Sequence, residues 1–528
     1  PAGLIEWRVL GDPTEGAVLA AAGRAGLDYE NATTEAVTRL HTFPYEPRRQ
    51  MASVVVALNE AGQHRIVGYV RGTAHAVLAQ STLIRRDGRE IPLDDETRAA
   101  LHATVDTYAA TGLRVLAVAS RELREEEENI GWRARDVEQQ LTLLGLIAVQ
   151  EPPQPEVARL VDGCRKAGIR VIIVTGGYGL TAEASARRAG IITAPRVQIV
   201  SGAELAEMKK GTLGLVIAPG EEVLFAQLDT AQKRMIVEAL QDRGEIVAFL
   251  GDSISDAPAL KQADIGVALS ASGTTVALAA ADIVLDASHP GGLLLAIEEG
   301  RAIFSNIQKF ATYLFTHNVA EAFVIVISVL FQLPLPLTVL QVLAIDLGTE
   351  LLPAVALSTE PPEPGILDQP PRARSRPLLE KAVLWRVFAW LGLIQGLMAL
   401  GAYLLGHWSG GWRPGMAFDE DGIVYMQATT LTYAAIVLAQ AGNVFACRTW
   451  LLPVTRMGIF TNRVLVAGVI VSTLAMLAMI YVEPLAQIFG FVAPTPWQWM
   501  VVATFAPLMF VAHEAAKWWA RRQSGRNE

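Results

Sequence analysis

Six long apolar runs in the C-terminal part of the sequence constrain this chain more than any other feature. They lie at 311–331, 335–357, 382–406, 424–446, 464–482 and 497–518. A helix needs about 20 residues to cross the ~30 Å hydrocarbon core of a bilayer, and each run has close to that length. We therefore predict an all-α bundle of six transmembrane helices. The alternative is a set of apolar helices in the core of a soluble protein.

The charged residues are divided unevenly around residue 310. Residues 1–310 contain 31 Lys and Arg against 40 Asp and Glu, whereas residues 311–528 contain 13 of each kind. The net charge of −9 is therefore carried by the first part, which argues against a nucleic-acid binder because such proteins present a basic face. The chain has two cysteines, Cys164 and Cys447, which is too few for a disulfide framework and suits a cytosolic soluble part.

Basic residues mark one side of the predicted bundle. They are Lys309, then Arg372, Arg374, Arg376 and Lys381, then Arg448, Arg456 and Arg463, then Lys517, Arg521, Arg522 and Arg526. Because cytoplasmic loops carry an excess of Lys and Arg, we expect a multi-pass protein of the cell membrane. Its soluble part and its C-terminus would both be cytoplasmic.

Acidic and neutral oxygen donors recur inside the first two runs. Asn318 and Glu321 have i, i+3 spacing, and Asp346, Thr349 and Glu350 have i, i+3, i+4 spacing, so each group shares a helix face. Carboxylates inside a membrane are costly unless they meet cations or one another. We predict a cage for a hard cation; the alternative is hydrogen bonding that holds helices together.

Three further features surround this predicted cage. Pro353 should loosen the second helix and free backbone carbonyls near the site. Gln440 and Asn443 on the fourth run would complete the cage or only join helices. His317, beside Asn318, is open to three interpretations: a fixed positive charge, a proton-linked group or a packing residue.

The segment 144–285 is typical of a parallel α/β sheet, with buried-strand runs at 168–175 and 245–251. Ligands bind beyond the carboxyl ends of such strands. There Thr175 would donate to a phosphoryl oxygen, Lys233 would neutralise phosphoryl charge, and Asp252 and Asp256 would hold Mg²⁺. Alternatively, the aspartates are helix caps. No residue of this segment is identifiable as an activated nucleophilic aspartate.

Residues 1–143 form a second soluble unit. Phe43, Arg48, Arg71 and Arg114 would hold a nucleotide by stacking and charge pairing. The alternative is one core phenylalanine among surface arginines.

Taken in order, the motifs resemble the C-terminal half of a type II P-type cation-transporting ATPase, of the calcium and sodium/potassium pump kind. GDPTEG, FPYEPRRQM, YVRGT and TGLRVLAVA resemble its nucleotide-binding domain. EPPQPEV, VTGGYGLTAEA, AQKRMIVEALQ, GDSISDAPAL and ADIGVAL resemble its phosphorylation domain. EEGRAIFSNIQKF resembles its stalk. THNVAE, the segment that contains IDLGTE and the remaining apolar runs resemble its last six membrane helices.

The resemblance implies a haloacid-dehalogenase-like α/β phosphorylation domain with an inserted α+β nucleotide-binding domain, followed by the six-helix bundle. The expected domains are 1–143 for nucleotide binding, 144–297 for phosphorylation and 298–528 for the stalk and membrane helices. ATP and Mg²⁺ are the implied cofactors.

The resemblance also implies residue roles. Contacts to ATP would come from Glu15, Phe43, Arg48, Arg71 and Arg114. The phosphoryl group would be held by Thr175 and Lys233, and Mg²⁺ by Asp252 with Asp256 beside it. The transported ion, which is Na⁺, K⁺, H⁺ or Ca²⁺, would be bound by Asn318, Glu321, Asp346, Thr349 and Glu350.

Departures from the family pattern leave two functions open. Gly177, Leu250, Ser255, Glu151 and Gln154 replace residues that are usual around the phosphorylation site. The DKTG aspartate, the actuator domain and four membrane helices are absent, so we expect this chain to need the N-terminal half of the pump as its partner. The main hypothesis is an ATP-driven cation pump; the alternative is an impaired nucleotide-binding relative with a regulatory or scaffolding role. A membrane-tethered phosphatase is the third and weakest hypothesis.

Overall fold

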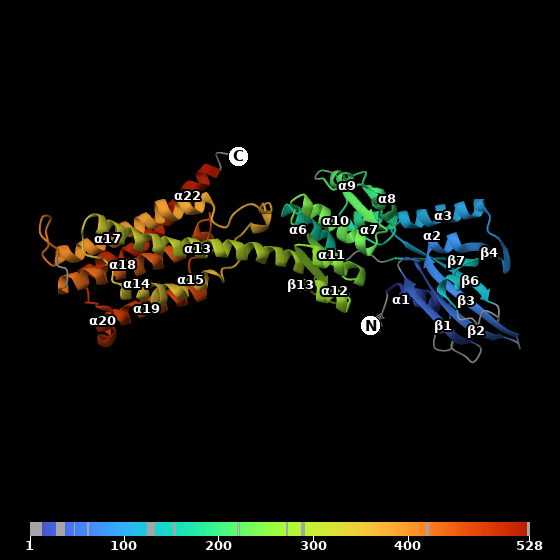
Figure 1. Cartoon of the computed structure of the whole chain (residues 1–528), viewed down its shortest axis with the longest axis horizontal. Coiled ribbons are helices and arrows are strands. Elements are labelled where there is room, and N and C mark those ends of the chain that lie inside the picture. Colours follow the sequence, from blue (N-terminus) through green and yellow to red (C-terminus); the bar gives the residue numbers. More distant parts are fainter. Residues whose placement is uncertain are drawn as a thin grey trace, which may run out of the picture. The chain divides into compact units, whose positions relative to one another are not determined.

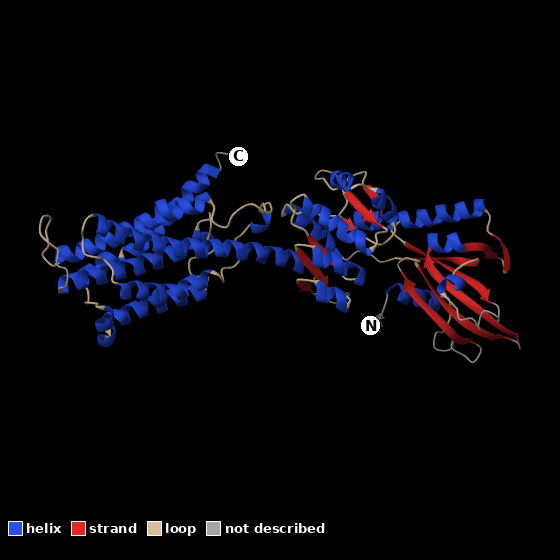
Figure 2. Ribbon diagram, in the orientation of Figure 1, coloured by secondary structure: helices blue, strands red, loops and turns tan. Residues whose placement is uncertain are grey.

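The computed structural model describes residues 13–27, 37–46, 48–60, 63–123, 132–150, 155–218, 220, 222–270, 273–286, 291–418 and 422–524. The chain divides into two compact units, Pro1–Arg165 with Ile169–Leu293, and Lys166–Gly168 with Leu294–Glu528. Every described strand belongs to the first unit (Figure 2), whereas the described regular elements of the second are all helical.

A seven-stranded sheet forms one part of the first unit, with the strand order β1-β2-β3-β6-β7-β4-β5. Its strands are β1 (Val37–Glu46), β2 (Met51–Glu60), β3 (Gln63–Thr73), β4 (Ser81–Arg86), β5 (Arg89–Pro92), β6 (Arg114–Leu123) and β7 (Leu141–Val149). The accompanying helices are α1 (Pro13–Arg24), α2 (Ala74–Gln80), α3 (Asp95–Ala110) and α5 (Ala134–Val137). All pairs are antiparallel except β4 with β7. The expected boundary at residue 143 falls within β7.

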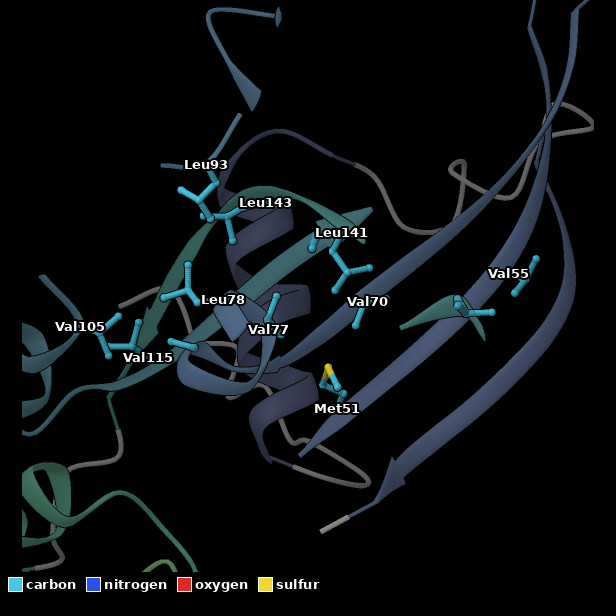
Figure 3. Close-up of a cluster of buried hydrophobic side chains, with 14 of the residues drawn as sticks. Met51, Val55, Val70, Val77, Leu78, Leu93, Val105, Val115, Leu141 and Leu143 are labelled. Carbon is cyan, nitrogen blue, oxygen red and sulfur yellow. The ribbon is translucent and has the colours of Figure 1, made fainter. Parts of the chain in front are cut away.

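One hydrophobic core holds this sheet against its helices (Figure 3). Val55 of β2, Val77 of α2 and Leu141 of β7 have no exposed surface. Each such side chain contributes about 1.5–3 kcal/mol by its removal from water. The core therefore fixes the strands that carry the predicted nucleotide residues.

The rest of the first unit contains two three-stranded sheets, β8-β10-β9 and β11-β12-β13, whose neighbouring strands are all parallel. This confirms the parallel α/β prediction. The strands are β8 (Ile173–Val174), β9 (Gln198–Ser201), β10 (Val223–Ala226), β11 (Ala248–Gly251), β12 (Ile265–Leu269) and β13 (Ile283–Leu285). The helices are α6 (Pro155–Lys166), α7 (Gly179–Arg188), α8 (Gly202–Glu207), α9 (Lys210–Val216), α10 (Thr230–Asp242), η1 (Ile254–Asp256), α11 (Ala257–Gln262) and α12 (Thr275–Ala280).

Six helical segments of the described chain are long and apolar enough to cross a membrane, as the sequence predicts. They are Gly292–Leu330, Val339–Leu357, Lys381–Ser409, Ile423–Cys447, Arg463–Tyr481 and Pro496–Arg522. The chain is thus a multi-pass membrane protein. The first segment is a single helix, α13 (Gly292–Leu330), which Figure 1 shows running without a break. It has no proline, so the stalk expected at 298–310 and the first span share one hydrogen-bonded ladder.

The second span changes its winding where the acidic residues lie. It consists of α14 (Val339–Leu343), a π-helical segment η2 (Ala344–Glu350) and α15 (Leu351–Leu357). Pro353 lacks the amide hydrogen that would bond the carbonyl of residue 349, so the change in helical hydrogen bonding lies beside the residue that the sequence predicts to loosen this helix. Short π-helical segments are frequent at functional sites.

The remaining spans surround α18 (Ile423–Cys447), which is the most buried of the six. The third span is α16 (Lys381–Trp385), η4 (Arg386–Leu391) and α17 (Gly392–Ser409); the fifth is α19 (Arg463–Tyr481); the sixth is α21 (Pro496–Ala503) and α22 (Phe505–Ser524). The connections contain η3 (Ile366–Asp368), η5 (Val454–Arg456) and α20 (Glu483–Phe489).

Candidate functional site

The first candidate site is a cluster of one histidine and three carboxylates on α13 and the π-helical segment η2. His317, Glu321 and Glu350 are buried, whereas the Asp346 side chain is 40% exposed. His317 of α13 has no exposed surface. Its Nε2 lies 3.0 Å from Oδ1 of Asp346 and 3.9 Å from Oε2 of Glu321, and its Nδ1 is hydrogen-bonded to Oε1 of Glu350. The structure therefore brings the three predicted acids together, with an imidazole at their centre.

A line of buried amides leads from this cluster across α18 to α22. Gln440 donates to Oε1 of Glu350 at 3.4 Å, and Asn443 donates to Gln440 at 3.2 Å. The Asn443 oxygen lies 2.9 Å from Nδ1 of His513. Gln440 and Asn443 are thus part of one polar network with the acids. The network also contains His513, which no sequence motif singles out.

Within the described part of the chain, the side chains of two predicted cage residues, Asn318 and Thr349, make no hydrogen bond to the acidic cluster. Asn318 is exposed, so the structure does not bring its side chain into the cluster; His317 occupies that position instead. The hydroxyl of Thr349 donates to the carbonyl of Ile345 at 3.1 Å. Thr349 nevertheless lines a pocket with Glu350, Gln440 and the buried Ser472.

The second candidate site lies at the carboxyl ends of β8 and β11 in the first unit. Lys233 stands in the first turns of α10, which begins at a capping box formed by Asp229 and Gln232. Its Nζ donates to Oδ1 of Asp256 at 2.7 Å and to Oγ of Ser255 at 3.0 Å. Lys233 and Asp256 are both buried, so this pair is a fixed part of the site.

The two aspartates that follow β11 have different partners. Oδ2 of Asp256 accepts hydrogen bonds from the Ser253 hydroxyl at 2.6 Å and from the Ser253 amide at 3.1 Å. Both Asp256 oxygens are therefore bound within the protein. No hydrogen bond or ion pair with a described residue engages the Asp252 carboxylate, which leaves it open to a ligand.

The charge on Asp256 is stabilised by its neighbours. Burial raises the pKa of this carboxyl, but hydrogen bonds from Lys233 and Ser253 act in the opposite sense and outweigh burial. The net result is a pKa below the usual range of an aspartate. Asp256 therefore stays ionised and holds the Lys233 ammonium.

The loop after β8 carries Thr175 and is anchored at both ends. The Thr175 amide donates to the Phe225 carbonyl of β10 at 2.9 Å, and its hydroxyl accepts from the Gly177 amide at 3.0 Å. Tyr178 donates to Asp106 of α3 at 2.7 Å. Burial, reinforced by Asp106, raises the pKa of Tyr178 to about 12. Thr175 is thus presented by a rigid loop at the strand ends.

The predicted nucleotide residues lie on different elements around the seven-stranded sheet. Arg71 of β3 forms an ion pair with Glu15 of α1, so one contact joins two members of the set. Phe43 of β1 is half-buried beside the His41 ring, with centroids 4.4 Å apart. Arg48 lies exposed in the turn after β1, and Arg114 is exposed at the start of β6.

Some of the residues with predicted roles lie outside the described part of the chain. These are Arg526, one of the basic residues that mark the predicted cytoplasmic side, and Glu151 and Gln154, two of the departures from the family pattern. Another departure, Leu250 of β11, has a side chain that is 47% exposed.

Fold and sites together define a multi-pass membrane protein with a haloacid-dehalogenase-like α/β unit and an acidic intramembrane cluster. Three protein families match the sequence. Residues 2–156 match "P-type ATPase, cytoplasmic domain N", residues 81–261 match "haloacid dehalogenase-like hydrolase", and residues 334–519 match "Cation transporting ATPase, C-terminus". The chain belongs to the type II P-type cation-transporting ATPases.

Several curated relatives cover nearly the whole chain. A calcium-transporting ATPase of Bacillus subtilis is 34% identical over 94% of this chain and 53% of its own length. Calcium-transporting ATPase 1 of Saccharomyces cerevisiae is 30% identical over 98% of this chain and 52% of its own. Potassium-transporting ATPase alpha chain 2 of Oryctolagus cuniculus is 28% identical over 92% and 49%. The chain spans about half the length of the curated relatives it matches.

Proposed function

We propose that this chain supplies the phosphoryl-handling and ion-binding parts of an ATP-driven cation pump. The observation that carries the proposal is the cluster of Glu321, Asp346 and Glu350 inside the membrane helices. Three carboxylates at this depth are costly unless a cation meets them. The same chain carries the Lys233 and Asp256 pair at the strand ends, which is suited to a phosphoryl group.

The two sites have separate tasks in this mechanism. ATP phosphorylates an aspartate of a DKTG motif, which is not among these 528 residues. The charge that develops on the transferred group is stabilised by Lys233 and by the Thr175 hydroxyl. We therefore expect turnover to need the part of the pump that bears the motif.

Magnesium fits this site because the Asp252 carboxylate can serve as a metal ligand. Mg²⁺ is commonly bound by one or two carboxylates together with phosphate and water. Asp252 has a carboxylate open to such a ligand, whereas both oxygens of Asp256 are bound by Lys233 and Ser253. Bound there, Mg²⁺ would neutralise phosphoryl charge. Asp256 then acts as a positioning residue for Lys233.

Nucleotide binding is assigned to the seven-stranded part of the first unit. Phe43 would stack on the adenine, and Arg48, Arg71 and Arg114 would neutralise the phosphates. Since Arg71 is paired with Glu15, an incoming phosphate competes with that carboxylate for the guanidinium. The soluble unit and the C-terminus are assigned to the cytoplasm by the basic residues between the spans.

The second candidate function is a nucleotide-binding relative that regulates or scaffolds without turnover. It is favoured by Gly177, which stands where the family has an acid, and by the exposed side chain of Leu250. Against it, Ser255 still contacts Lys233, so the substitution at that position keeps the lysine in place. Formation of a phosphoenzyme from labelled ATP excludes this second candidate.

The test of the pump is cation-stimulated ATP hydrolysis by the whole protein, including the DKTG segment, reconstituted into vesicles. We expect stimulation that is lost in Glu350→Gln and kept in Glu483→Gln, a matched change of an exposed acid. Absence of stimulation by each of Na⁺, K⁺, Ca²⁺, Mn²⁺, Co²⁺ and Zn²⁺ would refute the proposal.

A further inference from the structure

The position of His317 bears on which class of cation the membrane site accepts. Its two ring nitrogens face different carboxylates. Nε2 faces Asp346 at 3.0 Å and Glu321 at 3.9 Å, while Nδ1 is hydrogen-bonded to Glu350. One nitrogen is thus surrounded by two acids, and the other is held by a third.

A second observation comes from Glu321. This residue is 7% exposed, and its Oε1 has no hydrogen-bond partner in the described structure. Its other oxygen points toward Nε2 of His317. A buried carboxylate oxygen without a partner carries a desolvation cost, which a bound cation offsets.

We propose, on the basis of the pump function above, that this cluster binds a divalent first-row transition-metal ion through Nε2 of His317, Asp346 and Glu321. Glu350 is then a positioning residue that accepts the Nδ1 hydrogen and fixes the ring. A carboxylate behind a metal-bound imidazole is the usual outer-shell partner of such a ligand.

The distances fit this assignment. Nitrogen and oxygen ligands lie about 2.0–2.2 Å from Zn²⁺, so two donors on one tetrahedral ion are about 3.3 Å apart. The separations of 3.0 and 3.9 Å from Nε2 lie on either side of that value. Each of the two carboxylates is therefore placed so that a small side-chain movement lets it share an ion with Nε2. Binding of both to one ion also requires the Glu321 side chain to move toward Asp346, since the three donors that already lie within 4.8 Å of one another are those of His317, Asp346 and Glu350.

The donor set selects among cations by its chemistry. Ca²⁺ is typically bound by six to eight oxygens, and Mg²⁺ also prefers oxygen ligands. Imidazole suits Zn²⁺, Ni²⁺, Cu²⁺ and Fe²⁺, and affinity for a given site generally rises from Mn²⁺ toward Cu²⁺. A nitrogen at the centre of the cluster therefore favours a first-row transition-metal ion such as Zn²⁺ over Ca²⁺.

The competing occupant is the imidazole itself. As a protonated ring, His317 would donate to Asp346 and Glu350 and act as a built-in cation. Any transported ion would then be coordinated by oxygens alone. This arrangement is the outcome that overturns the proposal.

The test is X-ray absorption spectroscopy of the detergent-solubilised whole protein loaded with Zn²⁺ alone, without ATP. We expect a mixed nitrogen and oxygen shell that contains the outer-shell scattering of one imidazole. His317→Gln should remove that scattering and weaken Zn²⁺ binding at least tenfold. His407→Gln changes another fully buried histidine, on α17, and should leave both unchanged.

The positioning role of Glu350 has its own readout. Glu350→Gln should lower Zn²⁺ affinity by about 10–100-fold while the imidazole scattering remains. Substitution of Co²⁺ should give a d–d absorption spectrum that changes in His317→Gln. If a variant fails to fold, the wild-type spectrum still tests the proposal, because it shows whether the Zn²⁺ shell contains an imidazole.

The outcomes separate this inference from the pump function. An oxygen-only shell around Zn²⁺, or equal spectra for wild type and His317→Gln, refutes the metal assignment even when Ca²⁺ or Na⁺ stimulates ATP hydrolysis. An imidazole-containing shell supports the metal assignment even when no ion stimulates hydrolysis, in which case the pump proposal fails by itself.

Discussion

At the residue scale, Asp252 and Asp256 show how one short loop gives two carboxylates different tasks. Both oxygens of Asp256 are bound by Lys233 and Ser253. The Asp252 carboxylate has no such partner among the described residues. The same residue type, four positions apart, thus serves as a structural anchor in one case and as an available ligand in the other.

Exchanging each aspartate for asparagine separates these tasks. Asp256→Asn leaves the buried Lys233 ammonium without a charged partner, so we expect a loss on the order of 3 kcal/mol and a lower melting temperature. Asp252→Asn should change stability by no more than about 0.5 kcal/mol while it abolishes Mg²⁺-dependent phosphorylation. Thermal melts and phosphoenzyme assays check both. Equal melting temperatures for the two variants would contradict this division.

The lowered pKa of Asp256 predicts a dependence of stability on pH. A carboxyl whose folded-state pKa is depressed adds stability above its unfolded pKa of about 3.9. That contribution is lost as pH falls through the folded-state value. We expect melting temperature to fall below about pH 4 less steeply in Asp256→Asn than in wild type. If melting temperature falls with pH in the same way in both proteins, acidic residues other than Asp256 control the loss of stability at low pH.

At the scale of elements, sequence periodicity predicted the six spans and the grouping of Glu321, Asp346 and Glu350. It placed Asn318 with these acids although the side chain of His317 lies there, because helical geometry favours neither residue clearly. At about 100° per residue, Glu321 lies about 40° from His317 and about 60° from Asn318 on the other side. Packing of α13 against η2 decides between them, and a single sequence does not contain that information.

The same limit applies to other contacts between elements. The carboxyl ends of β8 and β11 were identifiable from apolar runs that end in small polar residues. The network partners of Asn443 were not, because His513 lies 70 positions away and only the packing of α18 against α22 brings them together. A hydrogen-bond partner that lies far away in the sequence can therefore be identified only from the folded structure.

The close approach of α18 and α22 makes a prediction for Gly442. A Cβ on this residue would overlap the backbone of Ala506. Gly442→Val should therefore push α22 away, break the Asn443–His513 hydrogen bond and lower the melting temperature. Gly401→Val is the matched control, since a Cβ there has no neighbour within 4 Å. A similar loss in both variants would show that valine acts through helix propensity instead.

At the scale of the whole molecule, the second unit is held together by a buried ion pair at one end of its helices. Arg448, directly after α18, donates to Glu360 through two nitrogens at 2.7 and 3.1 Å, and neither side chain is exposed. Asn462 at the start of α19 donates to the same carboxylate at 2.7 Å. Asn306 of α13 donates to the Glu360 carbonyl at 2.7 Å. Glu360, which follows α15, thus connects three other helices, α13, α18 and α19.

Removing one partner of this pair should have a large effect on stability. Glu360→Ala leaves the Arg448 guanidinium buried without a counter-charge, which costs about 3–5 kcal/mol. The control is Glu380→Ala, which breaks an exposed i, i+4 pair with Arg376 worth about 0–1 kcal/mol. The double variant Glu360→Ala with Arg448→Met should recover part of the loss, since it removes the uncompensated charge itself. The measurement is the melting temperature of wild type and the three variants in one detergent. An equal loss of stability in Glu360→Ala and Glu380→Ala would show that the buried pair does not hold the helices together.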